Sequence, residues 1–590
     1  MRHGPIRDLL AAGYVAAQRL RRQGSSAAWR LAGPLRGPHE VVEEFDVWAY
    51  LSELAERISL ILHDHDIKHL LLEDRLLSAP IVVVAHHDRR RALEALRADS
   101  RSRLWWVARL VHGIVGRPVP VRWQLPLLGG ETGLMVSRDL RTTSRRPLTD
   151  GELGVALAFW KVLPDQSSSP GGGVRPAGTM VAPVPNGVLD QIGPDLWRRI
   201  QRDGHRLTGP GPHLLAVSEP VDLVYTWVDG TDPQWLDRKA RGTGQPVSGY
   251  STDADIAARF VGYDELRYSL RSVQMYANWV RHIWIVTDRQ QPSWLQPDDR
   301  LTVVDHQNIF ADPGALPVFN SHAIESQLHH IPNLAEHYLY LNDDMLFGRP
   351  VRPEDFFHGN GISKFFTSPS LIDYADHESS DLAVTAAAKN NRDWLEAEFG
   401  RTITNKLRHT PQPQLRSVLE AFEAAHPALF DDVMRSKYRH ASDYSLTSSL
   451  SQYWSFARGN AVTGRIQNGY IDIASPEPEV TLERWLRRRD RQCLCINDSG
   501  QEDPDRQRAV GSALKGFFDA YYPLPSRWEK ADEFPFTQGR KRQLGSGRHM
   551  ESIVKLPSLT RVTKPHPDGK EQDCPRAAQR RIRRPGTKPE

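Results

Sequence analysis

The sequence predicts an α/β protein whose core is a Rossmann-like parallel sheet with helical additions. Between residues 221 and 342, short apolar segments alternate with segments whose apolar residues recur at helical spacing. This alternation is typical of a parallel sheet with crossover helices. Several apolar segments end directly in acidic residues, which fits strands that are buried on both faces and are polar only at their ends. An N-terminal α/β extension and a disordered basic C-terminal tail complete the predicted architecture.

The first half of the chain is predicted to hold a basic segment, residues 1–37, and an α/β domain, residues 38–164. Ile81–Ala85 is a run of β-branched and small apolar residues, typical of a buried strand, and residues 89–98 follow with a helical pattern. Residues 165–215 contain a stretch rich in Ser, Pro and Gly and a later Gly-Pro-Gly-Pro. We therefore expect a linker or long loop there.

The main domain is predicted at residues 216–528, and residues 529–590 are predicted to form a disordered tail because they are rich in Arg, Gly and Pro and poor in aromatics. Beyond Arg392 the main domain turns helical, and one amphipathic helix is marked by Leu415, Val418, Leu419 and Phe422. The expected strands are 221–228, 283–287, 301–304 and 337–342, and the expected helices are 263–277 and 321–330.

Charge is distributed unevenly along the chain. Residues 1–37 carry a net +6 and residues 540–590 a net +9, so the remaining body is near −11 although the total is only +4. Basic ends on an acidic body argue against a nucleic-acid-binding core and fit arms that contact an anionic membrane surface. No apolar run reaches the roughly 20 residues that span a bilayer. We expect a cytoplasmic protein, with peripheral membrane association through its basic ends as an option.

The chain has three cysteines, Cys493, Cys495 and Cys574. An odd and sparse set in a chain of 590 residues indicates a reducing compartment and no disulfide framework. A single Cys-x-Cys pair favours buried thiols over a metal site.

Asn342, Asp343 and Asp344 end the run of β-formers that starts at His337. The carboxyl end of a parallel strand is where such sheets bind ligands. Two adjacent acids there repel each other unless a cation lies between them, and Mg²⁺ commonly binds together with substrate phosphates. The pattern predicts a metal-assisted enzyme that acts on a phosphorylated donor.

Arg267 and Arg271 are four residues apart and should project from the same helix face. From there two guanidinium groups could contact a pyrophosphate at the sheet edge. The alternative is a surface ion-pair ladder with Glu265. The acids at the ends of other strands, Asp229 and Asp288, favour the first interpretation because all of them should gather along one rim.

His322, Glu325 and His329 would share one face of a helix over residues 321–330. The spacing is not the metalloprotease His-Glu-x-x-His, and no further ligand is signalled. Glu325 is expected to hold a sugar hydroxyl or orient a neighbour, or only to make a helix-face hydrogen bond. His409 lies two residues before Pro411, outside a regular helix interior. Its ordinary pKa near neutrality makes it a general-base candidate.

Several segments together resemble the Stealth family, which includes bacterial capsular and exopolysaccharide phosphotransferases and the catalytic subunit precursor of the lysosomal-enzyme GlcNAc-1-phosphotransferase. The resemblance covers about half of the chain, residues 220–500. The similar segments are Asp222–Gly230 for the first conserved region; 259–260, 264–272, 285–288, 292–295, His306, 323–325 and 341–344 for the second; 390–392, 409–411 and 438–440 for the third; and 495–498 for the fourth.

The resemblance implies transfer of a hexose- or N-acetylhexosamine-1-phosphate from a UDP-sugar to a hydroxyl of a glycan acceptor, with release of UMP, in exopolysaccharide or capsule synthesis. The acceptor oxygen would attack the sugar-linked phosphorus and not the anomeric carbon. Mg²⁺ (or Mn²⁺) and guanidinium groups suit the charge that develops on the phosphoryl group.

The same resemblance implies the roles of individual residues. Catalysis is assigned to His409, Arg439, Asp344 and Glu325, and the metal to Asp344, Asp343 and Asp498. The predicted substrate-binding set includes the two helix arginines and consists of Tyr225, Thr226, Trp227, Asp229, Gly230, Arg267, Arg271, Asn342 and His440.

Two other function classes stay open at this point. One is a metal-dependent glycosyltransferase that releases UDP and uses Asn342, Asp343 and Asp344 as its metal motif. The other is a protein without catalytic activity that binds glycans or polyanions through its basic ends.

Overall fold

The computed structural model describes residues 38–530, apart from positions 124, 126, 128–129, 169–172, 208–210, 243–261, 379–380 and 501–502. All described residues belong to one compact unit. The predicted basic segment 1–37, residues 531–590 of the predicted tail, and Cys574 lie outside the described residues.

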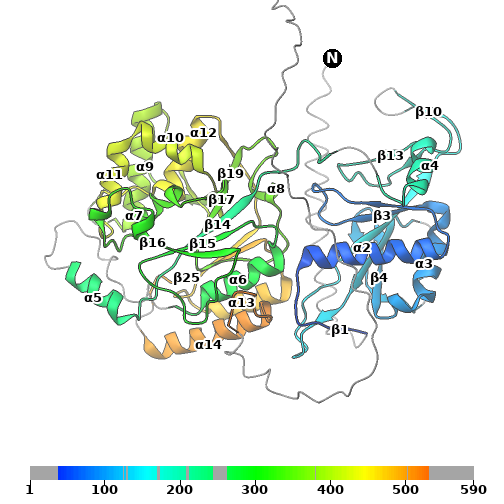
Figure 1. Cartoon of the computed structure of the whole chain (residues 1–590), viewed down its shortest axis with the longest axis horizontal. Helices are drawn as coiled ribbons and strands as arrows, with labels where there is room; N and C mark the ends of the chain where they lie inside the picture. Colours follow the sequence, from blue (N-terminus) through cyan, green and yellow to red (C-terminus); the bar gives the residue numbers. More distant parts are fainter. Residues whose placement is uncertain are drawn as a thin grey trace, which may run out of the picture. The chain divides into compact units, whose positions relative to one another are not determined.

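The N-terminal lobe is built on a mixed sheet in which β13-β12-β9-β7-β4-β5 are neighbours, β3 also pairs with β9, β2 with β3, and β6 with β4. The predicted strand and helix are confirmed as β3 (Ile81–Ala85) and α3 (Arg89–Ala98). Helices α2 (Val47–Asp64) and α3 both pack against β3 (Figure 1). The remaining strands are β2 (His69–Leu72), β4 (Trp105–Val111), β5 (Ile114–Val115), β6 (Val119–Pro120), β7 (Gly133–Arg138) and β9 (Val155–Val162).

Part of the expected linker belongs to this sheet. Strand β12 (Met180–Val181) pairs with β9, β13 (Gln191–Ile192) pairs with β12, and α4 (Pro194–Arg202) follows. Met180, Ile192 and Ile200 are buried in one apolar cluster with Trp160. The linker prediction is therefore wrong for residues 180–202, because the nearby Gly- and Pro-rich turns masked a few well-placed apolar side chains.

The second lobe is organised around a five-stranded sheet with the order β16-β15-β14-β17-β22. Strands β14 (Val221–Thr226), β15 (Ile283–Thr287), β16 (Leu301–Asp305) and β17 (His337–Asn342) run parallel, which confirms the Rossmann-like prediction. Strand β22 (Gln412–Leu415) joins antiparallel at the edge, where a proline such as Pro413 is tolerated. The strand order changes direction between β14 and β17, so the topological switch point lies between these two strands.

Two helices of this lobe differ from their predicted bounds. Helix α6 (Glu265–Tyr276) begins two residues later than expected and packs against β18 (Met345–Phe347). The expected helix 321–330 is interrupted: α7 (Ser321–Glu325), capped by the side chain of Asn320, is followed by a separate 3₁₀ turn, η7 (Leu328–His330). His322, Glu325 and His329 therefore do not lie on one continuous helix.

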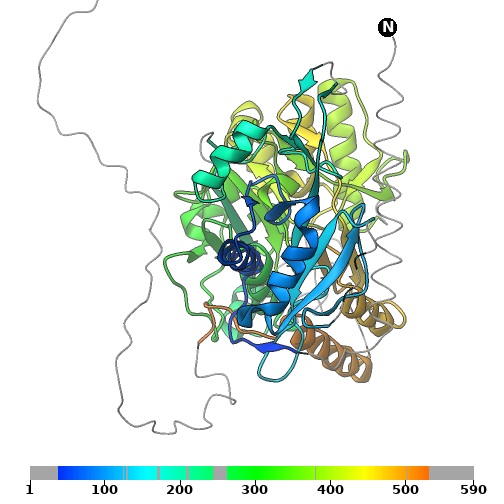
Figure 2. The same cartoon turned by 90° about the vertical axis from the view of Figure 1, so that its right-hand side faces the viewer.

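The helical additions follow the sheet in the chain. The amphipathic helix expected around residues 415–422 is confirmed as α10 (Arg416–Ala425). A small sheet with the order β18-β25-β24 contains β24 (Asn468–Asp472) and β25 (Cys493–Asn497). Helices α13 (Pro478–Arg488) and α14 (Pro504–Tyr521), near the end of the described chain, pack on each other (Figure 2). The other additional helices are α5 (Pro233–Gly242), α8 (Pro353–Phe356), α9 (Ala383–Phe399), α11 (Pro427–Arg435) and α12 (Ser451–Ala457).

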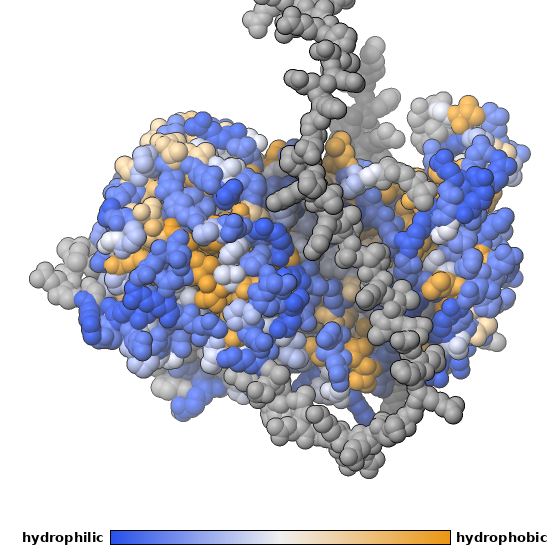
Figure 3. Space-filling view, in the orientation of Figure 1, coloured by the Kyte–Doolittle hydropathy of each residue, from blue (hydrophilic) through white to orange (hydrophobic). Residues whose placement is uncertain are grey.

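The five-stranded sheet is buried along its inner strands, and Tyr225, Tyr338 and Tyr340 are among the largest fully buried side chains. The surface facing the viewer in Figure 3 is mostly hydrophilic with smaller hydrophobic areas. Within the described part of the chain, no helix is both long and apolar enough to cross a membrane.

Candidate active site

The carboxyl ends of β14 and β17 lie side by side at the switch point. Thr226 is the last residue of β14 and pairs in register with Asn342, the last residue of β17. Asp343 and Asp344 form the turn that leads from β17 into β18. These side chains therefore occupy the edge of the sheet at which folds of this type bind ligands.

Three carboxylates gather at this edge, and we call Glu265, Asp343 and Asp344 the carboxylate cluster. Burial raises the pKa of Asp344 to about 7, and repulsion from Asp343 adds to the shift. Burial also raises the pKa of Glu265 and of Asp343, and at Glu265 the negative charge of Asp343 contributes. Like charges in a partly desolvated site cannot all stay ionised without a compensating positive charge.

The small sheet brings Cys495 to the cluster. Cys495 pairs in register with Met345, directly after Asp344, and its Sγ donates to Asp344 Oδ2 over 3.3 Å. This bond lowers the pKa of Asp344, against the larger effect of burial. Asp498 follows β25, and its Oδ1 accepts from the Gly500 N–H at 2.9 Å. Cys493 and Cys495 are both buried, as predicted for these thiols.

Two of the predicted metal ligands each carry a carboxylate oxygen of the kind that binds a hard cation. Oδ1 of Asp344 and Oδ2 of Asp498 are buried and have no hydrogen-bond partner in the described part of the protein. Oxygens of this kind are the ligands that Mg²⁺ prefers. The predicted ligands Asp343, Asp344 and Asp498 do not, however, form a group of three ligand atoms within 4.8 Å of one another; among the described residues, that spacing is found for His329, His330 and Glu423. An ion at Asp344 would therefore need further oxygens, such as those of a bound phosphate.

Tyr340 connects the two strand ends with Glu325. Its hydroxyl lies 2.8 Å from Oδ1 of Asn342 and 3.1 Å from Oγ1 of Thr226. Burial raises the pKa of Tyr340, and the neighbouring carboxylate of Glu325 raises it further. Oε2 of Glu325 is buried without a hydrogen-bond partner in the described structure. Glu325 and Asn342, both predicted site residues, are therefore brought together by a tyrosine that the sequence did not single out.

The residues that end β14 divide into a buried and an accessible group. Tyr225 is fully buried, and its hydroxyl contacts Ser269 Oγ at 2.8 Å. Its prediction as a substrate contact is therefore wrong, since its side chain points into the core. Thr226, Trp227, Asp229 and Gly230 are half-buried. The Asp229 backbone is fixed by the side-chain amide of Gln290.

Arg267 and Arg271 are held by a carboxylate from the end of the described chain. Arg267 Nε donates to Glu529 Oε2 at 2.6 Å, and Nε and Nη2 of Arg271 donate to Oε1 and Oε2 at 2.8 and 2.7 Å. Neither the expected pyrophosphate contact nor the alternative ladder with Glu265 describes this arrangement. The predicted start of the tail is also wrong by two residues, because Glu529 is buried and Lys530 N–H donates to the Trp294 carbonyl.

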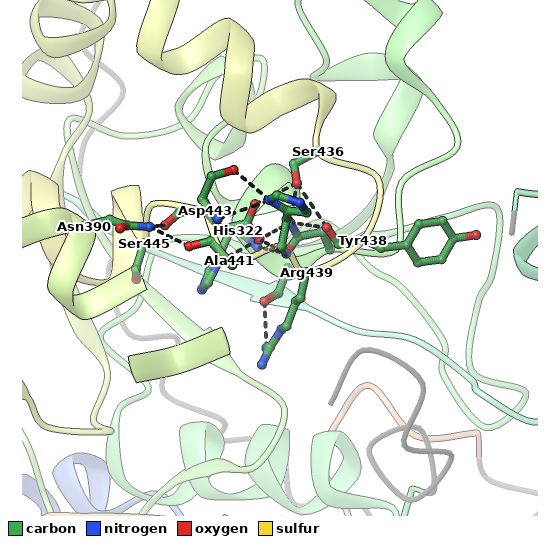
Figure 4. A network of polar contacts seen from close by, with 12 residues as sticks. His322, Asn390, Ser436, Tyr438, Arg439, Ala441, Asp443 and Ser445 are labelled. Atoms are coloured by element: carbon green, nitrogen blue, oxygen red, sulfur yellow. Dashed lines mark hydrogen bonds and ion pairs between the residues drawn. The ribbon is translucent and has the colours of Figure 1, made fainter. Parts of the chain in front are cut away.

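Arg439 lies in a loop that Asp443 organises (Figure 4), and His440 is the next residue of that loop. Asp443 accepts hydrogen bonds from Asn320 Nδ2 at 2.8 Å, Ser436 Oγ at 2.7 Å and the His440 N–H at 2.9 Å. Arg439 Nη2 donates to Ser321 Oγ at 3.1 Å. Because Ser321 starts α7 and Glu325 ends it, the loop positions Arg439 at one end of α7 and Glu325 lies at the other.

The same carboxylate also faces a histidine. His322 Nδ1 lies 3.6 Å from Asp443 Oδ2, and both side chains are buried. Burial would raise the pKa of Asp443, but hydrogen bonds and the proximity of His322 hold it below its usual range. Asp443 therefore stays ionised and can anchor the loop.

His409 is exposed and lies in the loop between β21 (Asn405–Leu407) and β22. Its ring centroid is 5.3 Å from that of Tyr470, and Tyr470 pairs in register with Cys495. One aromatic ring thus separates His409 from the Cys495–Asp344 contact. Desolvation by the surrounding protein, together with repulsion from Lys406, holds the pKa of His409 below 6.5. Its imidazole is therefore neutral at pH 7.

The sequence reasoning missed several residues of this site. Glu265 was considered only as a surface partner of the arginines, although its place at the start of α6 points toward the sheet edge. Tyr340 could have been found from its position two residues before Asn342, since alternate residues of a strand face the same side. Asp443 and Tyr470 carried no signal, because their contacts come from segments far apart in the chain.

Comparisons with known proteins agree with the site's segments. Four family models match in chain order: Stealth protein CR1, conserved region 1, at residues 219–242; CR2 at 259–365; CR3 at 396–456; and CR4 at 484–536. The carboxylate cluster and Glu325 fall in the second region, His409, Arg439 and Asp443 in the third, and Cys495 in the fourth.

Three curated relatives are named exopolysaccharide phosphotransferases. One from Streptomyces coelicolor is 46% identical over 377 residues, which is 60% of this chain and 63% of that protein. A second from the same organism is 36% identical over 491 residues, 78% of this chain and 87% of that protein. CpsY of Mycobacterium leprae is 40% identical over 321 residues, 54% of this chain and 58% of that protein. The chain thus spans less than two thirds of the first and third relatives.

Proposed function

The chain belongs to the Stealth family, and from this we propose that it is a phosphotransferase of exopolysaccharide synthesis that moves a sugar-1-phosphate from a UDP-sugar to a hydroxyl of a glycan acceptor. UMP is the expected leaving group. The names of the relatives support the reaction class. The finer assignment of donor and leaving group rests on what the resemblance to the Stealth family implies, and the carboxylates of the site are compatible with it.

The observation that carries the proposal is the carboxylate cluster beside unpartnered oxygens at the switch point. Asp344, with Asp343, would hold Mg²⁺ (or Mn²⁺), and Asp498 would contribute from the small sheet. Bound there, the ion would neutralise the charge of a diphosphate and of its leaving group. Without a cation, burial and mutual repulsion favour protonated acids, so the site is suited to a ligand that brings positive charge with it.

The chain's own residues supply the remaining functions of a phosphoryl-transfer site. Arg439, anchored through its loop by Asp443, would stabilise the equatorial oxygens of the transferred phosphoryl group. His409 would take the proton of the acceptor hydroxyl, because a pKa below 6.5 leaves its imidazole mostly neutral at pH 7. Glu325 and Asn342, joined through Tyr340, would hold sugar hydroxyls. Thr226, Trp227, Asp229, Gly230 and His440 remain the proposed contacts of the donor.

The fate of the donor's β-phosphorus tests this proposal. The purified chain is given Mg²⁺, a glycan acceptor and a panel of UDP-sugars that carry a radiolabelled β-phosphate. A sugar-1-phosphate transferase places the label in the glycan, as a phosphodiester visible by phosphorus NMR. A glycosyltransferase leaves the label in UDP, which would contradict the proposal. A protein that only binds glycans would leave the donor intact, which would contradict it as well.

A further inference from the structure

Two adjacent histidines and a glutamate meet between η7 and α10, outside the candidate active site. His329 Nε2 lies 2.7 Å from Glu423 Oε2, and His330 Nε2 lies 2.8 Å from the same oxygen. The three ligand atoms all lie within 4.8 Å of one another. His329 is fully buried, and His330 and Glu423 keep about a quarter of their side chains exposed. The group is therefore compact but reachable from solvent.

The contact made by the second ring nitrogen of His330, Nδ1, determines which ring nitrogen carries the proton. Nδ1 of His330 faces the carbonyl oxygen of Ile309 at 3.0 Å, and a carbonyl can only accept, so Nδ1 carries the proton. In the neutral ring Nε2 then presents a lone pair to the carboxylate oxygen of Glu423. Two lone pairs at 2.8 Å repel each other, so a positive species must be shared between them. That species is either a second proton on His330 or a metal ion.

The surroundings of the group match those of a metal site. A ligating histidine commonly donates its second ring N–H to a carbonyl, as His330 does to Ile309. Phe430 contacts His329 edge-on, with ring centroids 5.9 Å apart, and shields the inner side. Glu420 is exposed one turn before Glu423 on α10, and its charge acts on both histidines. It could supply a second carboxylate by rotating its side chain.

We propose that His329, His330 and Glu423 form a zinc site that joins η7 to α10. Two imidazole nitrogens and one carboxylate suit Zn²⁺, whereas Mg²⁺ prefers oxygen ligands. The site is separate from the carboxylate cluster and does not depend on the proposed reaction. Zinc here would tie the segment that follows α7, and hence Glu325, to the helical additions. His329 is the weaker of the two histidine ligands, because its Nδ1 has no partner within the described structure to accept a proton.

Zinc binding to the full-length chain is the direct test. The protein is stripped with a chelator, returned to excess Mg²⁺ to occupy oxygen sites, and titrated with Zn²⁺ against a chromophoric competitor at neutral pH. One Zn²⁺ per chain is expected, with a rise in the thermal unfolding midpoint and, on substitution by Co²⁺, visible bands of a low-symmetry four- or five-coordinate ion. Failure of the wild-type protein to bind Zn²⁺ would overturn the proposal whatever the variants do.

Variants locate the ion. His330→Gln and Glu423→Gln should each weaken zinc binding by more than about 100-fold, since even the loss of an outer-shell partner costs roughly 10- to 100-fold. His282→Gln, which removes a half-buried histidine bonded to Thr302, is the matched control and should bind like the wild type. Asp344→Asn should also retain the zinc. Zinc lost in Asp344→Asn but kept in Glu423→Gln would place the ion in the carboxylate cluster and contradict the proposal.

Discussion

Arg271 and Glu529 form a buried bidentate ion pair, with Nε and Nη2 of the arginine 2.8 and 2.7 Å from the two carboxylate oxygens. The two residues are 258 positions apart. The pair fastens the end of the described chain to α6, whose first residue, Glu265, belongs to the carboxylate cluster. The sequence suggested that Arg267 and Arg271 bind a ligand. In the structure they instead hold α6, and with it Glu265 of the carboxylate cluster, in place.

Glu529→Gln should destabilise the protein in a pH-dependent way. Burial alone would raise the pKa of Glu529, but Arg271 and Arg267 hold it below 4.5. The ionised carboxylate therefore stabilises the fold fully above pH 4.5, and this contribution is lost as the pH falls below that value. Breaking a buried pair costs about 3–5 kcal/mol, which chemical denaturation at pH 7 would measure. The difference from wild type should shrink at pH 4.

The control for that measurement is Glu483→Gln, because Glu483 is largely exposed in its pair with Arg487. It should change stability by less than about 0.5 kcal/mol. Equal stability of Glu529→Gln and wild type at pH 7 would contradict the role given to the pair.

Asp344→Asn should abolish most turnover while the chain stays folded. The amide keeps the size of the side chain but removes the charge that would hold the metal. Loss of a group that stabilises transition-state charge typically lowers kcat about 10²–10³-fold. Steady-state kinetics over a range of Mg²⁺ concentrations would measure the change, with Asp299→Asn as a control on an exposed acid. Wild-type kcat in Asp344→Asn would remove this residue from the mechanism.

Arg439→Gln should lower kcat by a similar factor, with a smaller change in KM, if its guanidinium acts on the transferred phosphoryl group. Arg439→Lys should recover part of the loss, since it keeps the charge but not the planar fork. Arg435→Gln is the matched control, because Arg435 lies nearby in the chain and forms ion pairs with the exposed acids Asp431 and Asp312. A change in KM alone would indicate a ground-state contact instead.

The lowered pKa of His409 predicts the acid limb of the pH profile of kcat/KM. A base must be unprotonated to act, and the pKa of His409 lies below 6.5. The kcat/KM of the wild type should therefore fall on the acid side, with its half-maximal point below pH 6.5. His409→Gln should lower kcat about 10²–10⁴-fold and remove this limb.

His358→Gln, at a histidine whose pKa is also lowered by burial but which lies after α8, should leave the profile unchanged. An acid limb that persists in His409→Gln would assign the titration to another group.

The parallel sheet was predictable because its strands are buried on both faces and read as uninterrupted apolar runs. The predicted place of Asn342, Asp343 and Asp344 at a strand end follows from the same rule and is confirmed. The partners of these residues were not predictable in the same way. Cys495 reaches Asp344, and Glu529 reaches Arg271, across more than 150 positions of chain. A helical period also cannot show that a helix breaks, as it does between Glu325 and Leu328.

The identity of the released nucleotide tests the central claim most directly. The purified chain is incubated with Mg²⁺, UDP-sugars and a glycan acceptor, and the nucleotide product is identified by chromatography, with Asp344→Asn as the inactive control. We predict acceptor-dependent release of UMP by the wild type and none by the variant. Acceptor-dependent release of UDP would contradict the account, because it would mean that the sugar carbon and not the phosphorus is attacked.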